Sequence, residues 1–406
     1  MKKFIKRTDI ILSVFCILFF AFMFSGDYIL PDKVVFYDGQ QSVRIMSVFT
    51  AEKNKSVEIE NVENNSNESA KISLFGVLPV ATVSATETTR QYVYVGGNLV
   101  GIRLYTDGIL VVGTDSVDSP DGVISPAEEC GIKKGDILTA VGEKKIDSVS
   151  GFIGYINASE GDGISVTVMR DGKELKVNLK PAFSVTENKY RCGLWLRDST
   201  AGIGTMTFAD PTEKVIASLG HAICDSETGS ILPVGEGDIL CADINGCIKG
   251  TKGATGQIKG NFASETIGEL SANNEYGVYG TYTYASFDED MLYPVASQTE
   301  IRTGKAQIIS TVTPDGAEFY DAEIERITYS EDKAVRSMVI KITDEELIGI
   351  TGGIIQGMSG SPIIQNGMLV GAVTHVFLND PTRGYGIFAE TMISVGKTVS
   401  EEKNSR

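Results

Sequence analysis

The spacing of apolar and polar residues divides the chain into distinct parts. An apolar stretch runs from Ile10 to Phe24 and is broken only by Ser13. A polar run from about Thr50 to Ser69 has little apolar periodicity, which predicts a flexible linker. Beyond Ala182, short apolar runs alternate with turn signals and few long helical periods occur. The C-terminal part is therefore predicted to be all-β, and its length of about 210 residues suits a double barrel.

The N-terminal apolar stretch predicts a membrane segment. Four basic residues precede it and Asp27 and Asp32 follow it, so the N-terminus is expected in the cytoplasm and the body outside. The stretch is shorter than the ~20 residues of a usual span, yet no small-residue cleavage site follows it. We favour an uncleaved anchor over residues 1–26; a cleaved signal peptide is the alternative. Residues 27–84 are predicted to form an extracytoplasmic linker.

The region that follows, residues 85–182, contains two motifs of peptide-binding modules. A glycine-rich turn comprises Gly96-Gly97-Asn98-Leu99-Val100-Gly101-Ile102, and its N–H groups could hold a peptide carboxylate. A Pro-initiated short helix, a glycine stop and a turn follow in residues 125–138, which end in Gly135-Asp136-Ile137-Leu138. Together these resemble a PDZ domain, with Gly96, Gly97, Leu99, Gly101 and Ile102 as its peptide-binding residues. The Asp171-Gly172 dipeptide predicts a closing hairpin.

Composition excludes several function classes. A net charge of −17 opposes binding to a phosphate backbone, so no nucleic-acid partner is expected. With two histidines in the chain and no Cys-x-x-Cys spacing, we expect no metal site and no cofactor. A Cys241–Cys247 disulfide and free thiols both remain open.

The strongest chemical signal is the segment Gly357-Met358-Ser359-Gly360-Ser361-Pro362. Glycines on both sides of Ser359 permit a tight turn that presents its hydroxyl as a nucleophile. The N–H groups of Gly357 and Ser359 are the predicted oxyanion-hole donors.

Only two histidines can serve as the base for this serine. His221 follows a glycine at the end of an apolar run, far enough before Ser359 for the two to come from different barrels. His375 lies on the strand after the nucleophile turn and is interpreted as a strand histidine near the cleft. For the acid that orients the base, spacing leaves Asp225, Asp238, Asp243 and Asp344 open.

Three segments carry a family resemblance. They are residues 192–205, Leu219-Gly220-His221 and residues 351–362, and they resemble the stage IV sporulation protein B (SpoIVB) serine peptidases. The resemblance runs through anchor, PDZ domain (85–182) and a chymotrypsin-like peptidase domain (183–400) in the same order. It implies His221 and Ser359 as catalytic residues and Asp344 as the acid, although an acid so close to the serine departs from chymotrypsin-like enzymes in general.

The resemblance also implies a function in sporulation signalling. Such a peptidase is exported from the forespore into the space between two membranes, cleaves itself, and then cleaves a membrane-bound regulator to trigger processing of the mother-cell sigma factor. Self-cleavage is expected between Thr50 and Arg90. Two alternatives remain: a non-catalytic exported PDZ scaffold that binds peptide termini, and a Ser-Lys peptidase whose base is a lysine such as Lys341.

Overall fold

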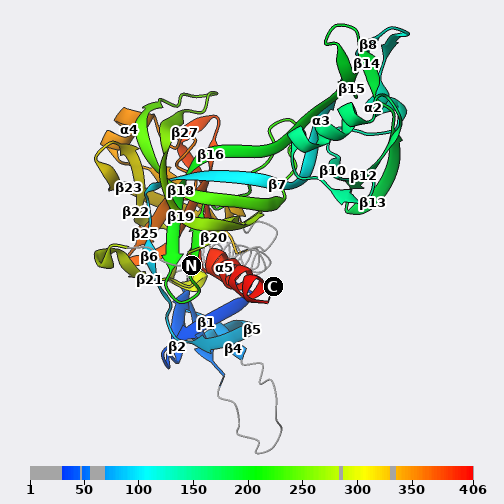
Figure 1. The fold of residues 1–406 in the computed structure, drawn as a ribbon. Helices are drawn as coiled ribbons and strands as arrows, with labels where there is room; N and C mark the ends of the chain where they lie inside the picture. The colour runs from blue at the N-terminus through cyan, green and yellow to red at the C-terminus, as the bar shows by residue number, and fades with distance from the viewer. Residues whose placement is uncertain (1–29, 46–47, 55–68, 283–286, 330–334, 406) are drawn as a thin grey trace, which may run out of the picture.

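The protein is mainly β and consists of an N-terminal sheet, two barrels and a module that projects from the first barrel (Figure 1). A computed structural model describes residues 30–45, 48–54, 69–282, 287–329 and 335–405. The predicted anchor, residues 1–26, lies outside these residues. In the part of the chain that is described, no helix is long and apolar enough to cross a membrane.

The prediction of a linker over residues 27–84 is wrong for the described part of that segment. Five strands form a sheet in the order β1-β5-β4-β3-β2. Phe36, Ile45 and Ile72 are fully buried in its core. Each of these strands has only a short alternation of apolar and polar residues. The polar run between β3 and β4 therefore led to the prediction of a linker for the whole segment. The strands are β1 (Lys33–Tyr37), β2 (Ser42–Ile45), β3 (Phe49–Lys53), β4 (Ser69–Leu74) and β5 (Leu78–Thr88).

The predicted double barrel is confirmed. In the first barrel six strands follow one another in the order β7-β18-β19-β20-β17-β16, and pairing of β7 with β16 closes the ring. The strands are β7 (Leu99–Thr114), β16 (Leu194–Asp210), β17 (Val215–Ser218), β18 (Val234–Ile248), β19 (Gln257–Asn274) and β20 (Gly277–Thr281). Two short strands, β6 (Tyr92–Val95) and β21 (Leu292–Pro294), extend the sheet beyond β16.

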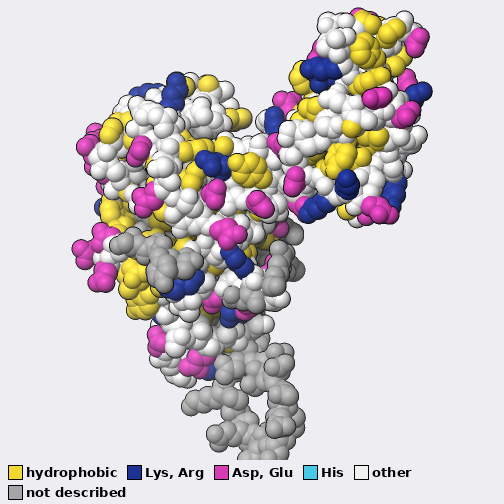
Figure 2. All heavy atoms as spheres, viewed as in Figure 1, with side chains coloured by type: hydrophobic (Ala, Val, Ile, Leu, Met, Phe, Trp, Pro, Cys, Tyr) yellow, Lys and Arg dark blue, Asp and Glu magenta, His cyan; other side chains and the backbone are white. Residues whose placement is uncertain are grey.

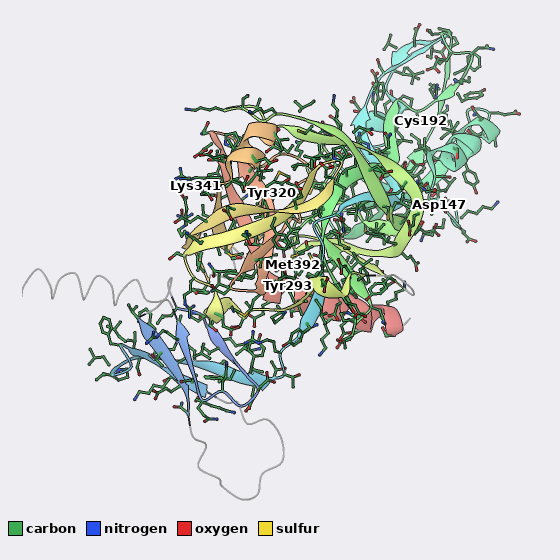
Figure 3. All side chains as sticks on the ribbon, turned by 90° about the vertical axis from the view of Figure 1, so that its left-hand side faces the viewer. Asp147, Cys192, Tyr293, Tyr320, Lys341 and Met392 are labelled. Carbon is green, nitrogen blue, oxygen red and sulfur yellow. The ribbon has the colours of Figure 1, made fainter. Side chains whose placement is uncertain are left out.

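The second barrel is a closed ring in the order β22-β23-β24-β27-β26-β25. A shared apolar cluster holds the barrels together, since Phe208 of the first packs with Ile309 and Ile364 of the second. Met392 joins this cluster from α5 (Ala389–Asn404), which follows the last strand and packs back on β17 (Figure 3). The strands are β22 (Gly304–Thr313), β23 (Gly316–Ile327), β24 (Met338–Ile342), β25 (Pro362–Gln365), β26 (Met368–Phe377) and β27 (Asp380–Phe388).

The PDZ-like module is an insertion into the first barrel and does not precede it. Residues 99–105 of β7 pair with β16 and β18 in the barrel, whereas Ile109 and Leu110 pair with β10 of the module. The long strands β7 and β16 carry the module away from the barrels (Figure 1). Its main elements are α2 (Pro126–Glu129), β10 (Ile137–Val141), α3 (Val149–Ala158), β12 (Ile164–Arg170) and β13 (Lys173–Leu179). The predicted hairpin at Asp171-Gly172 is confirmed, because Arg170 pairs with Lys173.

The glycine-rich turn predicted to bind peptide belongs to the first barrel. The N–H groups of Gly96 and Gly97 donate to the carbonyls of Thr207 and Met206, at 2.9 and 2.8 Å. A Cβ on Gly97 would lie 2.4 Å from Ile309 of the second barrel. Leu99, Gly101 and Ile102 continue along β7 opposite residues 202–205 of β16. These glycines permit close packing between the barrels. A glycine-rich sequence required for close packing looks the same as one required for a carboxylate-binding loop.

Candidate active site

The turn that carries Ser359 lies between the two barrels. Gly357 and Gly360 have φ values of +100° and +94°, which favour glycine. A Cβ on Gly360 would lie 2.1 Å from the Thr205 carbonyl oxygen and 2.5 Å from the Leu219 nitrogen. The turn of the second barrel therefore touches the first barrel just before His221.

Two threonines of β16 tie this turn to the first barrel. The Thr205 N–H donates to the Ser359 carbonyl at 3.0 Å, and the Thr205 hydroxyl donates to the Gly357 carbonyl at 2.7 Å. The Thr207 hydroxyl donates to the Gly360 carbonyl at 2.8 Å. These positioning residues were missed from the sequence, although Thr205 ends one of the segments that carry the family resemblance.

His221 reaches the site from the first barrel. Leu219 and Gly220 both have φ of +68°, which turns the chain after β17. A Cβ on Gly220 would lie 2.9 Å from Cγ2 of Thr374. Thr374 is also the residue whose carbonyl accepts the Ser359 hydroxyl, at 2.8 Å. The segments that bear the predicted base and nucleophile thus meet at Thr374, and the hydroxyl must rotate about χ1 to donate to an imidazole instead.

A backbone carbonyl orients the imidazole of His221. Its Nδ1 lies 2.8 Å from the Ala222 carbonyl oxygen. Because a carbonyl can only accept, this hydrogen bond assigns the proton to Nδ1 and leaves Nε2 as the basic nitrogen. Burial lowers the pKa of His221, and the hydrogen bond to Ala222 opposes that shift only in part. The imidazole is consequently neutral and able to accept a proton near pH 7.

His375 lies against the predicted base. The centroids of the His375 and His221 rings are 4.8 Å apart, with the planes inclined by 38°. Desolvation, followed by electrostatic interaction with His221 and Arg336, lowers the pKa of His375 to about 4. His375 is therefore a neutral neighbour of the base at physiological pH, in keeping with its interpretation as a residue near the cleft.

The backbone of the turn carries the two N–H groups that were predicted to form the oxyanion hole. The Gln356 carbonyl accepts from Ile258 N–H at 2.8 Å, and the Met358 carbonyl accepts from Ser361 N–H at 3.0 Å. In a trans peptide the N–H points away from the carbonyl, so Gly357 and Ser359 direct their N–H groups away from these partners. Among the hydrogen bonds of the described residues, none uses either N–H. The arrangement suits an oxyanion hole.

A cleft lies beside the turn. It has a volume of ≈ 660 Å³ and lies against the first barrel. Gln356 and Gly357 line it from the nucleophile turn, and Ile203, Ile258 and Phe262 supply apolar walls. Gly357, a predicted oxyanion-hole donor, is thus part of the wall of this cleft.

The family model described as SpoIVB peptidase S55 matches residues 188–393, which contain His221, Ser359, the second barrel and every strand of the first barrel except β7. The chain belongs to this family. Members are serine peptidases, so this S55 chain is an enzyme that acts on protein substrates. A PDZ domain model matches residues 102–180, which identifies the inserted module.

Similar solved structures include PDZ domains and serine proteases. The PDZ domain of the SdrC-like protein from Listeria monocytogenes is 24% identical over 23% of this S55 chain and 90% of its own, with a TM-score of 0.19. The HtrA-type protease AlgW with decapeptide is 10% identical over 76% of this chain and 66% of its own, with a TM-score of 0.32. The thermostable serine protease AL20 from an extremophilic microorganism is 12% identical over 50% and 91%, with a TM-score of 0.30.

Asp344 of this S55 peptidase caps a helix in the structure. Its carboxylate accepts from Leu347 N–H at 3.0 Å, at the start of α4 (Glu345–Thr351), and from Asp321 N–H at 3.2 Å. Gly384 pairs with Ile340 on one side and with Val376, the residue after His375, on the other, so Ile340 and Val376 lie at the same height in the sheet. Asp344 lies four residues beyond Ile340, or roughly 13 Å along the strand direction. The role of Asp344 in orienting His221 therefore stays a prediction, and the structure gives its carboxylate a different contact.

An Asp344→Asn variant separates the two roles. Asparagine also caps helices, so the fold is retained, while the negative charge is lost. From the observed contacts we expect kcat/KM within tenfold of wild type, against the ~10⁴-fold loss typical of a triad acid. Turnover of a peptide substrate measures this, with Asp344→Ala as the variant that loses the cap and about 1 kcal/mol of stability. A folded but inactive Asn variant would show that Asp344 orients the base in another conformation.

The other acids that spacing left open have partners of their own. Asp225 is buried and paired with Arg197. Asp238 lies 3.8 Å from Arg103 on the adjacent strand. Asp243 lies opposite Asn261 in the β18–β19 pair. Cys241 and Cys247, for which a disulfide was left open, are both free thiols.

The PDZ module of this S55 chain has its groove at a place other than the predicted one. A cavity of ≈ 450 Å³ lies between α3 and the first residues of β16, with Ile153 and Phe152 on one wall and Leu194, Trp195 and Leu196 on the other. Among the described strands, residues 194–197 pair only with β7, so their other edge is open. Apolar side chains gather on the visible face of the module (Figure 2). The sequence signal was present in Gly193-Leu194-Trp195-Leu196, a glycine followed by apolar residues.

Proposed function

We propose that this chain is a signalling endopeptidase of sporulation that uses Ser359 as nucleophile and His221 as general base. The observation that supports this most directly is the contact of the two barrels at Thr205, Leu219 and Gly360, which brings the serine turn against the segment of His221.

In the proposed reaction, the Ser359 hydroxyl leaves the Thr374 carbonyl and donates its proton to Nε2 of His221 as the oxygen attacks the peptide carbonyl. The oxyanion accepts from the N–H groups of Gly357 and Ser359. Protonated His221 then gives its proton to the leaving amine, and an acyl-enzyme forms on Ser359. A water activated by His221 hydrolyses this ester and restores the serine.

The proposed substrates are the chain itself and a membrane-bound regulator, as the family resemblance implies. The body would be exported and held by the N-terminal stretch in the space between the two forespore membranes. Self-cleavage remains proposed between Thr50 and Arg90. Within the described part of that region, Phe75 and Val77 at the β4–β5 turn are 71% and 78% exposed, whereas the flanking strands are held in the sheet. An exposed turn enters a peptidase cleft more readily than a paired strand does.

A fluorophosphonate probe tests the chemistry and the self-cleavage together. Wild-type protein is expected to become labelled at Ser359 and to lose an N-terminal fragment on incubation. Ser359→Ala should do neither, and Ser361→Ala, which alters the neighbouring buried hydroxyl, controls for labelling elsewhere in the turn. Intact mass and peptide mapping identify the label and the cut. Equal sizes of incubated wild type and Ser359→Ala would contradict self-cleavage, and an unlabelled wild type would favour the scaffold alternative.

The Ser-Lys alternative has less support from the geometry. Lys341 lies on β24, with Glu323 and Arg383 as its neighbours on the adjacent strands. Figure 3 shows Lys341 at the edge of the second barrel. A Ser-Lys enzyme would keep its activity when His221 is replaced.

A further inference from the structure

The loop that begins at His221 is organised by a buried carboxylate four residues later. One oxygen of Asp225 accepts from the N–H groups of Glu227 and Thr228, at 3.0 and 2.8 Å. The Asp225 backbone also bonds to Gly229 and Ser230. Asp225 is 1% exposed. This residue therefore fixes the turn through which the His221 loop returns.

A single arginine of β16 neutralises this carboxylate. Arg197 forms an ion pair with the second carboxylate oxygen of Asp225. Burial acts to raise the pKa of Asp225, but the hydrogen bonds from Thr228 and Glu227 and the Arg197 charge lower it overall. A buried carboxylate that loses its cation is strongly destabilised, so the loop depends on the position of Arg197.

Arg197 also stands at the end of the PDZ groove. Trp195 and Leu196, which line the groove, directly precede it on β16. Asp198, which follows it, accepts from the Val149 N–H at 2.7 Å and so ties β16 to the start of α3. The two walls of the groove, α3 and β16, are therefore joined by a hydrogen bond next to Arg197. A peptide that adds to the open edge of residues 194–196 must act on the backbone that holds this arginine.

We propose that the Arg197–Asp225 ion pair positions the loop that carries His221 and couples the state of the base to the occupancy of the PDZ groove. The inference rests on the proposed function and adds its regulation. The two sites are not in contact, because Thr205 beside the serine turn lies ten positions beyond Trp195 on β16, or roughly 33 Å of extended strand. The His221 loop covers part of this distance, since four residues, at most ~14 Å of extended chain, separate His221 from Asp225 beside Arg197. Arg197 and Asp225 are positioning residues, since neither touches the reacting atoms.

Coupling of this kind is reciprocal, so a change at the active site must reach the groove. Trp195 is the only tryptophan of the chain and is 61% exposed. Its emission therefore reports on the groove without an added label. Covalent modification of Ser359 with diisopropyl fluorophosphate changes the active site, and the Trp195 emission then shows whether the groove responds.

The test compares Arg197→Gln with Arg103→Gln in the full chain. Arg103 forms an ion pair with Asp238 on the neighbouring strands β7 and β18, a pair that includes no residue of the His221 loop. We expect Arg197→Gln to slow labelling of Ser359 by about 5- to 100-fold, Arg197→Lys to recover part of this rate, and Arg103→Gln to label as wild type does. Labelling of wild type should shift the Trp195 emission, and this shift should vanish in Arg197→Gln.

The outcomes separate this inference from the proposed function. A wild-type protein that does not label at Ser359 overturns both. If wild type labels, and Arg197→Gln labels equally fast or keeps the emission shift, the coupling is overturned while the peptidase stands. A slower but still folded Arg197→Gln that retains the shift would reduce the ion pair to a structural role, and melting curves of the three variants check the fold.

Discussion

Replacing His221 with glutamine is expected to lower kcat/KM by about 10⁴- to 10⁶-fold while the fold is retained. The amide keeps a polar group beside Ala222 but cannot accept the serine proton. Peptide hydrolysis and the rate of fluorophosphonate labelling of Ser359 measure the loss. His375→Gln is the matched control, because its ring packs against His221 but makes no recorded hydrogen bond to Ser359 among the described residues; we expect it to retain activity within about tenfold.

The pH profile of the wild type checks the same assignment. Burial lowers the pKa of His221 below 6.5, so its basic form persists to lower pH than that of a free imidazole. The midpoint of the loss of kcat/KM toward acid pH should accordingly lie below pH 6.5, and this loss should disappear in His221→Gln. Full activity of His221→Gln would exclude this histidine as the base and favour a lysine.

Replacing Gly360 with alanine is expected to abolish activity and to destabilise the protein by about 3 kcal/mol or more. The new Cβ would lie 2.1 Å from the Thr205 carbonyl oxygen, and φ at this position is +94°. The methyl group must push the serine turn away from the first barrel, where both catalytic segments meet. Thermal unfolding and Ser359 labelling measure the two effects.

Gly367→Ala is the control for this substitution. Gly367 also has a positive φ, +73°, but a Cβ there would meet nothing within 4 Å. It should cost only the conformational strain of about 1 kcal/mol and leave labelling unchanged. Similar behaviour of the two variants would show that close contact between barrels at Gly360 is not required.

Local sequence determined the chemistry of this protein. The glycines around Ser359 favour a turn, and the scarcity of histidine left His221 and His375 as the histidines that could serve as the base. Turn signals between short apolar runs also predicted the double barrel, since strand alternation and turn residues act over few positions. The PDZ hairpin at Asp171-Gly172 followed from the same local rule.

Only the tertiary structure decided which residues meet. Gly96 and Gly97 look like a peptide-binding loop, yet their N–H groups and close packing serve the barrels, because the chain leaves the first barrel for the PDZ module and returns to it. Asp344 caps α4 in the fold and the Ala222 carbonyl accepts from His221, two contacts that the sequence did not predict, while the role of Asp344 as the acid stays a prediction. Contacts such as Thr205 with the serine turn join strands from different barrels. Periodicity along a chain carries no information about such pairings, which depend on how closed barrels pack on one another.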